Sequence, residues 1–147
     1  VAVSAGAFVA DSLVSEFVRE TRSSVRRPHV RLTLCDAFTA RGLMGLLRPH
    51  SAYGISSFGE AADFCEAFIN TDDPVPSTSL PLRCAANVDV TRSAARASFT
   101  PLPGDTLHSW PAAWYGANCI ALLKEFGLTP LHGVDGAPPR GDLRAAP

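Results

Sequence analysis

The first residues of the chain carry apolar side chains at helical spacing. Polar residues fill most other places within residues 2–22, and the large apolar residues recur about every four positions at Phe8, Val9, Leu13, Phe17 and Val18. Positions four apart lie on one face of an α-helix. The pattern predicts an amphipathic N-terminal helix that ends at the polar stretch 23–28.

A period of two replaces this spacing between residues 29 and 35. Val30, Leu32 and Leu34 alternate with polar residues and therefore share one face of an extended chain. This alternation predicts a β-strand. A short helix is then expected from Asp36 or Thr39 to Arg48, because the following proline disfavours helical geometry in its predecessor.

The middle of the chain predicts further short elements. A short strand is expected over residues 52–56. Ser57 precedes Glu60 by three residues, which is the spacing of a capping box, and predicts a helix that runs to about Ile69. Prolines and aspartates then indicate a loop over residues 71–81.

The last third predicts a hairpin, a helix and a tail. Residues 82–91 and 94–100 are expected to form two strands joined by a tight turn. Residues 109–126 predict a helix that stops at Gly127. Frequent glycine and proline after that position predict an extended tail over residues 128–147.

Together these elements predict one globular domain over residues 1–127. The fold class is α/β or α+β, with a small sheet of three to four strands packed against helices. The N-terminal amphipathic helix and the extended C-terminal tail complete the expected architecture.

Composition restricts the functional classes. The chain has 147 residues, of which 46% are hydrophobic and 18% charged, and its formal net charge is −1. Such a chain collapses into a core, and it has no overall positive field to attract nucleic acid. No apolar run approaches the roughly 20 residues that span a bilayer.

The cysteines and the first residue suggest where the protein resides. Cys35, Cys65, Cys84 and Cys119 include no Cys-x-x-Cys pair, so we expect free buried thiols and an intracellular location. The chain begins with Val1, which is compatible with a mitochondrial protein after removal of a transit peptide. A trimmed N-terminus would give the same sequence.

Short motifs do not point to a cofactor or a metal. Residues 54–59 have the Gly-x4-Gly spacing of a phosphate-binding loop, but Glu60 and Ala61 stand where lysine and serine or threonine are needed. The segment 53–58 is similar at three positions to the aromatic strand of RNA-recognition motifs, but it lacks the basic residue. The adjacent Asp72 and Asp73 are expected to be solvated turn residues, and no short His/Cys spacing fits zinc.

A catalytic site is the first alternative. Cys35 and Asp36 lie at the carboxyl end of a predicted strand, where α/β active sites often form. With His50 or His108 as a base, Cys35 would be the nucleophile of a small enzyme. A buried structural thiol is the simpler interpretation of this cysteine.

The leading hypothesis is a non-enzymatic accessory or scaffold subunit of a larger multiprotein assembly. The aromatic residues Trp110, Trp114 and Tyr115 cluster at the start of the last predicted helix, and Leu131 lies in the tail. Aromatic clusters of this kind occur at protein interfaces, although the tryptophans would serve equally well in the core. A further alternative is an RNA-binding module that uses a basic cluster at Arg22, Arg26, Arg27 and Arg31.

Overall fold

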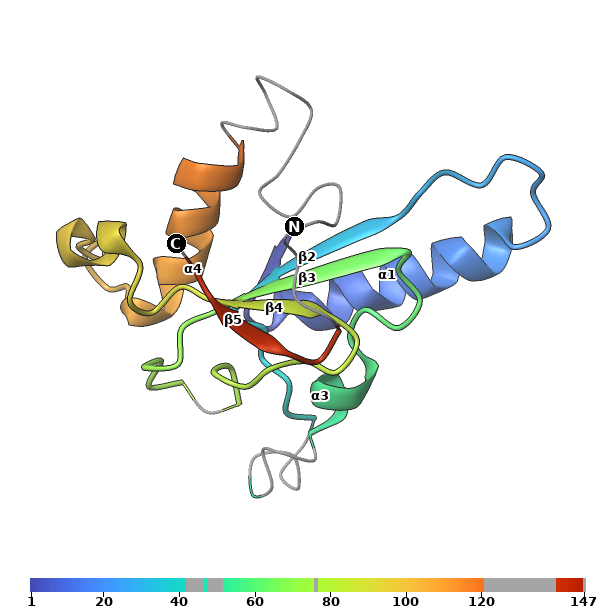
Figure 1. The fold of residues 1–147 in the computed structure, drawn as a ribbon. Coiled ribbons are helices and arrows are strands. Elements are labelled where there is room, and N and C mark those ends of the chain that lie inside the picture. Colours follow the sequence, from blue (N-terminus) through green and yellow to red (C-terminus); the bar gives the residue numbers. More distant parts are fainter. Residues whose placement is uncertain (42–46, 48–51, 76, 121–139, 147) are drawn as a thin grey trace.

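The computed structural model describes residues 1–41, 47, 52–75, 77–120 and 140–146. Within these residues five strands form one parallel sheet, and they lie side by side in chain order (Figure 1). The strands are β1 (Ala2–Val3), β2 (Arg31–Cys35), β3 (Phe64–Ile69), β4 (Ala86–Asp89) and β5 (Leu143–Ala145). The α/β class is confirmed, with five strands instead of three to four.

Helical segments connect the strands. They are α1 (Gly6–Thr21), α3 (Tyr53–Ser57), the 3₁₀ helices η2 (Ala94–Ser98) and η3 (Leu107–Ser109), α4 (Trp110–Tyr115) and the π-helical turn η4 (Gly116–Ile120). No helix among the described residues is long and apolar enough to cross a membrane.

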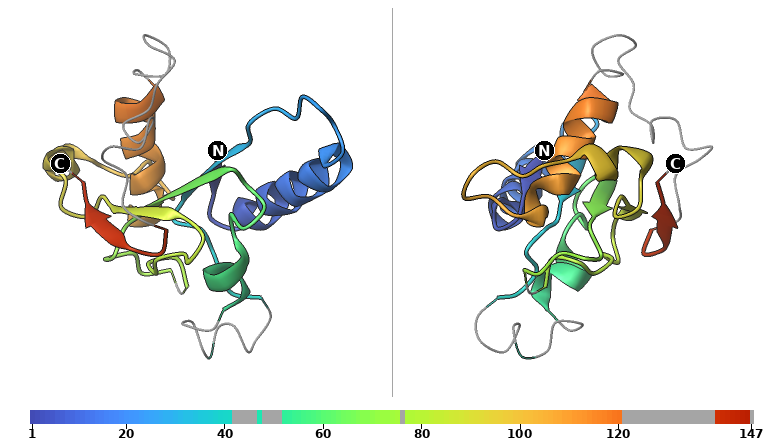
Figure 2. Two further views of the ribbon diagram at one scale, coloured as in Figure 1. Left: turned by 45° about the vertical axis from the view of Figure 1, so that its right-hand side comes forward. Right: turned by 90° about the vertical axis from the view of Figure 1, so that its left-hand side faces the viewer.

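Each face of the sheet carries its own apolar cluster. Leu34 and Ala67 pack with α1 and α3 on one face, whereas Phe68 and Val88 pack with α4 on the other. Figure 2 shows α1 and α4 from two further sides. Because successive side chains of a strand point to opposite faces, the central strands are covered on both sides.

This double burial explains the main error of the sequence analysis. The helix expected from Ser57 to Ile69 is wrong, since residues 64–69 form β3 and run parallel to β2. A strand buried on both faces has a nearly continuous apolar sequence, which resembles a buried helix. The strand expected at 52–56 is also wrong, because α3 occupies that place.

The predicted hairpin does not form. Residues 82–91 contain β4 as expected, but residues 94–98 are the 3₁₀ helix η2. The partners of β4 are β3 and β5, both parallel to it. The alanine-rich sequence of η2 lacks the β-branched residues that favour strands.

The two ends of the chain agree with the predicted elements better than the segment after β2 does. The N-terminal helix and the strand over residues 29–35 are confirmed by α1 and β2. The expected tail contains β5 over Leu143–Ala145, which adds to the edge of the sheet beside β4. Residues 37–41 are not helical, and residues 42–46 and 48 of the helix expected up to Arg48 lie outside the described residues.

Candidate metal centre

Polar side chains collect at the carboxyl edge of the central strands. Asp36 follows β2, Asn70 follows β3, and Asp89 ends β4. All three strands are parallel and in register, so their carboxyl ends meet at one edge. Sites in open parallel sheets form at this edge.

Asp36 is fully buried, and only one of its two carboxyl oxygens has a hydrogen-bond partner among the described residues. It has a positive φ of 40°, which is uncommon for a residue other than glycine. Its Oδ1 accepts a hydrogen bond of 2.7 Å from the backbone N–H of Asn70. Its Oδ2 is buried and has no hydrogen-bond partner among the described residues, and the residue is 0% exposed. Burial raises the pKa of Asp36 to about 9, and the shift is increased by the charge and the side-chain proximity of Asp73 and by the charge of Asp89.

Asp73 lies in the loop between β3 and β4, and its side chain is also completely buried. Its Oδ1 accepts the backbone N–H of Val75 at 2.9 Å, which is an Asx-turn contact. Its Oδ2 accepts the hydroxyl of Thr78 at 2.5 Å. These bonds fix the carboxylate, so the sequence expectation of a solvated turn residue is wrong.

His108 reaches the same place from η3. Its Nδ1 lies 2.5 Å from Asp73 Oδ2 and 3.8 Å from Asp36 Oδ2. Because Asp73 Oδ2 can only accept a hydrogen bond when ionised, the contact requires a proton on Nδ1. The Nε2 atom is buried without a hydrogen-bond partner among the described residues. Thr106 caps the start of η3, because its hydroxyl oxygen accepts the backbone N–H of His108 at 3.2 Å.

Asp36, Asp73 and His108 form what we call the metal centre. One ligand atom from each residue lies within 4.8 Å of those from the other two. Two carboxylate oxygens and one imidazole nitrogen are a suitable donor set for a first-row divalent ion. Within the part of the chain that the structure describes, the buried Asp36 Oδ2 has no hydrogen-bond partner, and a positive ligand at this place would supply one.

The sequence analysis found part of this centre. Asp36 and His108 belong to the catalytic alternative, and the structure brings their side chains together. Cys35 is fully buried in the apolar cluster beneath α4, so its thiol is not placed to attack a substrate. His50 lies outside the described residues. Asp73 was expected to be a solvated turn residue, because two adjacent carboxylates in a proline-rich loop are usually exposed, and its place beside Asp36 could not be foreseen while β3 was assigned to a helix.

The predicted interaction residues are mostly in the core. All three aromatic residues of α4 are only 3–5% exposed: Trp114 and Tyr115 pack against Phe68, and Trp110 packs against Phe99. Their part in an interface stays a prediction, but little of their surface is available to a partner. Leu131 lies outside the described residues.

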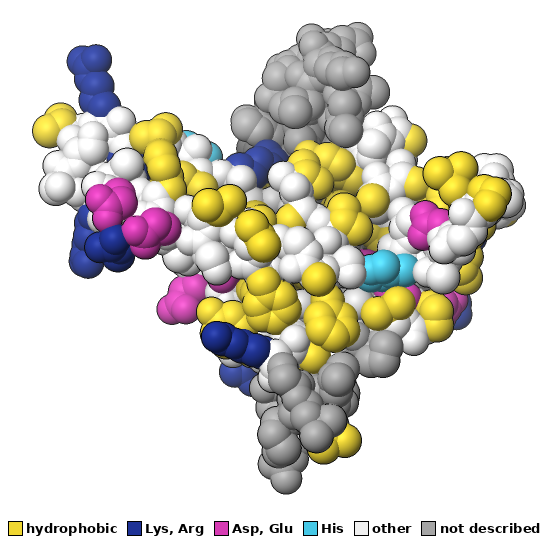
Figure 3. Space-filling view, turned by 180° about the vertical axis from the view of Figure 1, so that it is seen from behind, with side chains coloured by type: hydrophobic (Ala, Val, Ile, Leu, Met, Phe, Trp, Pro, Cys, Tyr) yellow, Lys and Arg dark blue, Asp and Glu magenta, His cyan; other side chains and the backbone are white. Residues whose placement is uncertain are grey.

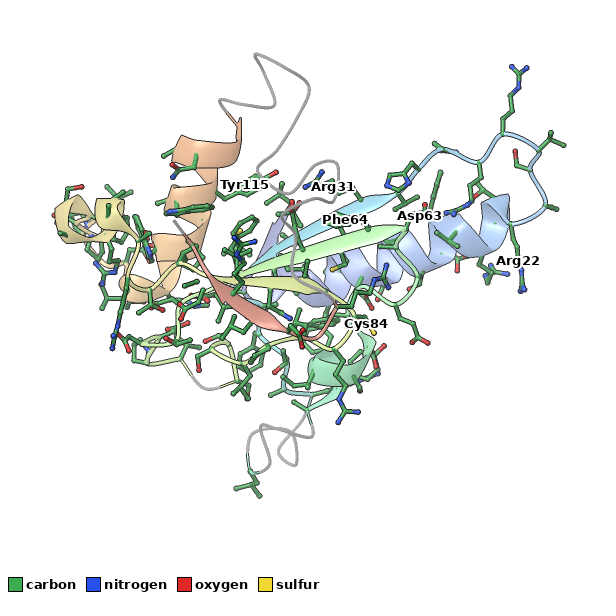
Figure 4. All side chains as sticks on the ribbon, in the orientation of Figure 1. Arg22, Arg31, Asp63, Phe64, Cys84 and Tyr115 are labelled. Atoms are coloured by element: carbon green, nitrogen blue, oxygen red, sulfur yellow. The ribbon has the colours of Figure 1, made fainter. Side chains whose placement is uncertain are left out.

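Two of the four arginines that were expected to bind RNA form ion pairs with carboxylates of the same chain. Arg27 pairs with Asp63, and Arg31 binds the buried carboxylate of Glu66 at 2.7 Å. The Arg31 guanidinium also lies 4.8 Å from the centre of the Phe64 ring. Both residues are labelled in Figure 4. A guanidinium held in this way is a structural group of the sheet.

The chain matches no protein-family model, no curated protein and no solved structure.

Proposed function

We propose that this protein is a divalent-metal-binding α/β domain whose ligands are Asp36, Asp73 and His108. The observation that carries the proposal is the buried, unpartnered Oδ2 of Asp36, which lies 3.8 Å from His108 Nδ1. Leaving a polar atom buried and unpaired is costly, and a bound cation removes that cost. An ion at this place would replace the proton that His108 shares with Asp73.

The donor set favours a transition metal over calcium or magnesium. Imidazole nitrogen suits zinc, iron, nickel and copper, whereas calcium and magnesium prefer sites made of oxygen atoms alone. Three protein ligands leave further coordination positions for water, as in open zinc sites. We therefore choose Zn²⁺ as the probe, with Mg²⁺ as the comparison.

The test is a calorimetric titration of the metal-free protein with Zn²⁺. We expect one ion per chain and much weaker binding of Mg²⁺. His108→Ala should weaken zinc binding by at least about tenfold, since even outer partners of ligands matter by 10–100-fold. Asp73→Asn should weaken it similarly while keeping the shape of the side chain.

His29→Ala is the matched control. The side chain of His29 is 70% exposed and lies 3.9 Å from Asp63, far along the chain from the metal centre. This variant should bind Zn²⁺ as the unmodified protein does. Circular dichroism would verify that each variant is folded. Zinc binding that is equal in the His108→Ala and unmodified proteins would refute the proposal.

A second candidate function is that of an accessory subunit in a larger, mitochondrial assembly. The outer face of α1 supports it, because Val9, Leu13 and Phe17 are 63%, 66% and 41% exposed. They lie four residues apart and form a stripe along the helix. Figure 3 shows hydrophobic side chains gathered on the face of the molecule opposite the view of Figure 1.

A groove runs beside this stripe. It has a volume of about 390 Å³ and is lined by Leu13, Val14, Phe17 and residues 28–31. Its lining is mostly apolar, with His29 and Arg31 as its polar members, and apolar grooves are surfaces on which amphipathic helices dock. Leu13→Asp should leave the fold intact and release the protein from a native complex. Migration of the unmodified protein near 15.5 kDa in a gentle extract would exclude this second candidate.

A further inference from the structure

The helix that follows the histidine of the metal centre is held on the sheet by packing. The 3₁₀ helix η3 leads directly into the six residues of α4, which continue into the five residues of η4. Most of the stability of a helix in a protein comes from tertiary packing and little from the helix itself. Its place on the sheet depends on packing, in which the Phe68 ring lies 5.3 Å from the rings of Trp114 and Tyr115.

Polar contacts hold the first turn of this helix to the carboxyl edge of the sheet. The Asn70 side-chain amide donates to the carbonyl of Leu107 at 3.1 Å. The Trp110 indole donates to the carbonyl of Val90 at 2.8 Å. The His108–Asp73 contact lies between these two bonds along the chain, and it is the one that an ion would replace.

We propose that a divalent ion in the metal centre fastens α4 to the sheet, so that occupancy of the centre controls undocking of this helix. This inference rests on the proposed function. The three ligands come from three separate segments, namely the end of β2, the loop after β3, and η3. When α4 undocks, His108 leaves with it and only two ligands stay behind. The ion therefore binds the docked state more tightly, which is the condition for shifting a conformational equilibrium.

The size of the expected fall in the undocked population of α4 follows from the ion concentration. If the ion binds only the docked state, the undocked population falls by the factor 1 + [ion]/Kd. At an ion concentration of about 100 times Kd, this factor is about 100. Amide hydrogens of residues 107–118 that exchange through undocking should slow by the same factor.

The experiment is hydrogen exchange of the full chain, followed by mass spectrometry, with chelator or with Zn²⁺ at about 100 times the measured Kd. We expect slower exchange in residues 107–118 and unchanged exchange in the solvent-exposed last turns of α1. His108→Ala should abolish the effect of zinc. The control His29→Ala should retain it.

The outcomes separate the two proposals. Zinc binding without slower exchange in residues 107–118 would overturn this inference and leave the proposed function standing. Equal slowing across α1 and residues 107–118 would also overturn it, because the ion would then stabilise the whole fold. Absence of zinc binding in the titration would overturn both proposals.

Discussion

His108 and Asp73 are 35 residues apart in the chain, yet His108 Nδ1 lies 2.5 Å from Asp73 Oδ2 at the edge of the sheet. The contact joins the loop after β3 to the segment that begins α4. The nearby Oδ2 of Asp36 has no hydrogen-bond partner among the described residues. In the metal-free centre, Asp73 is therefore hydrogen-bonded through both of its carboxylate oxygens, whereas Asp36 is hydrogen-bonded through Oδ1 alone.

The first prediction concerns this unsatisfied carboxylate. Asp36→Asn should stabilise the protein in the presence of a chelator, because it removes a buried carboxyl group that faces Asp73 and Asp89. The amide oxygen can still accept the N–H of Asn70. Zinc affinity should fall at least about tenfold, since one ligand is lost. Thermal unfolding and titration measure the two effects, and a less stable metal-free variant would contradict the argument.

The second prediction concerns Gly59, which has a φ of +85°. A Cβ atom there would lie 2.4 Å from Cys65 Sγ. Gly59→Ala should therefore cost the strain of a positive φ and a steric overlap of roughly 1–3 kcal/mol. Gly104→Ala is the control, because Gly104 has the same φ and no atom within 4 Å of the added Cβ. Urea unfolding should show the larger loss for Gly59→Ala, and equal losses would refute the steric explanation.

The third prediction concerns the pH dependence of stability. Asp11 is 5% exposed and accepts the N–H of Gly59 at 2.9 Å. Burial raises the pKa of Asp11 above its usual value of 3.8. As the pH rises, this carboxyl ionises first in the unfolded chain and only later in the folded protein. The folded state therefore loses stability between the unfolded and the raised folded pKa, and the loss persists above that window.

Asp11→Asn removes the titration and retains an oxygen for the N–H of Gly59. The free energy of unfolding of this variant, relative to the unmodified protein, should rise as the pH increases above the usual pKa of 3.8 and stay constant once Asp11 is ionised in the folded protein too. Urea unfolding at several pH values measures the difference. A constant difference would show that Asp11 titrates alike in both states.

The fourth prediction concerns thiol reactivity. Cys65 is 1% exposed, and burial raises the pKa of its thiol to about 12. Cys84 is partly exposed. Because the thiolate is the reactive form, iodoacetamide should modify Cys84 in the native protein and Cys65 only after unfolding. Peptide mass spectrometry identifies the modified residue, and early labelling of Cys65 would contradict its buried placement.

Local periodicity was sufficient to predict α1 and β2, although the large apolar residues Val9, Leu13 and Phe17 of α1 face outward and the buried residues of this helix are Ala7 and Asp11. It failed for β3, where Phe64, Ala67 and Phe68 are apolar toward both sides of the sheet. A strand covered by helices on both faces loses the alternation by which strands are recognised.

The metal centre required the topology as well as the sequence. Asp36 and His108 were identifiable as titratable residues, but nothing in their spacing of 72 positions indicates proximity. Asp73 became a ligand only through the parallel register of β2 and β3 and the loop that follows. Long-range contacts of this kind are set by the strand order, which short motifs do not encode.

The order of the strands also bears on how the protein is made. Because β1 to β5 lie in the order of the chain, each strand can join a neighbour that has already left the ribosome. No strand has to be inserted between two that are already paired. The sheet is thus suited to assembly during translation, and the histidine arrives only after both aspartates have been synthesised.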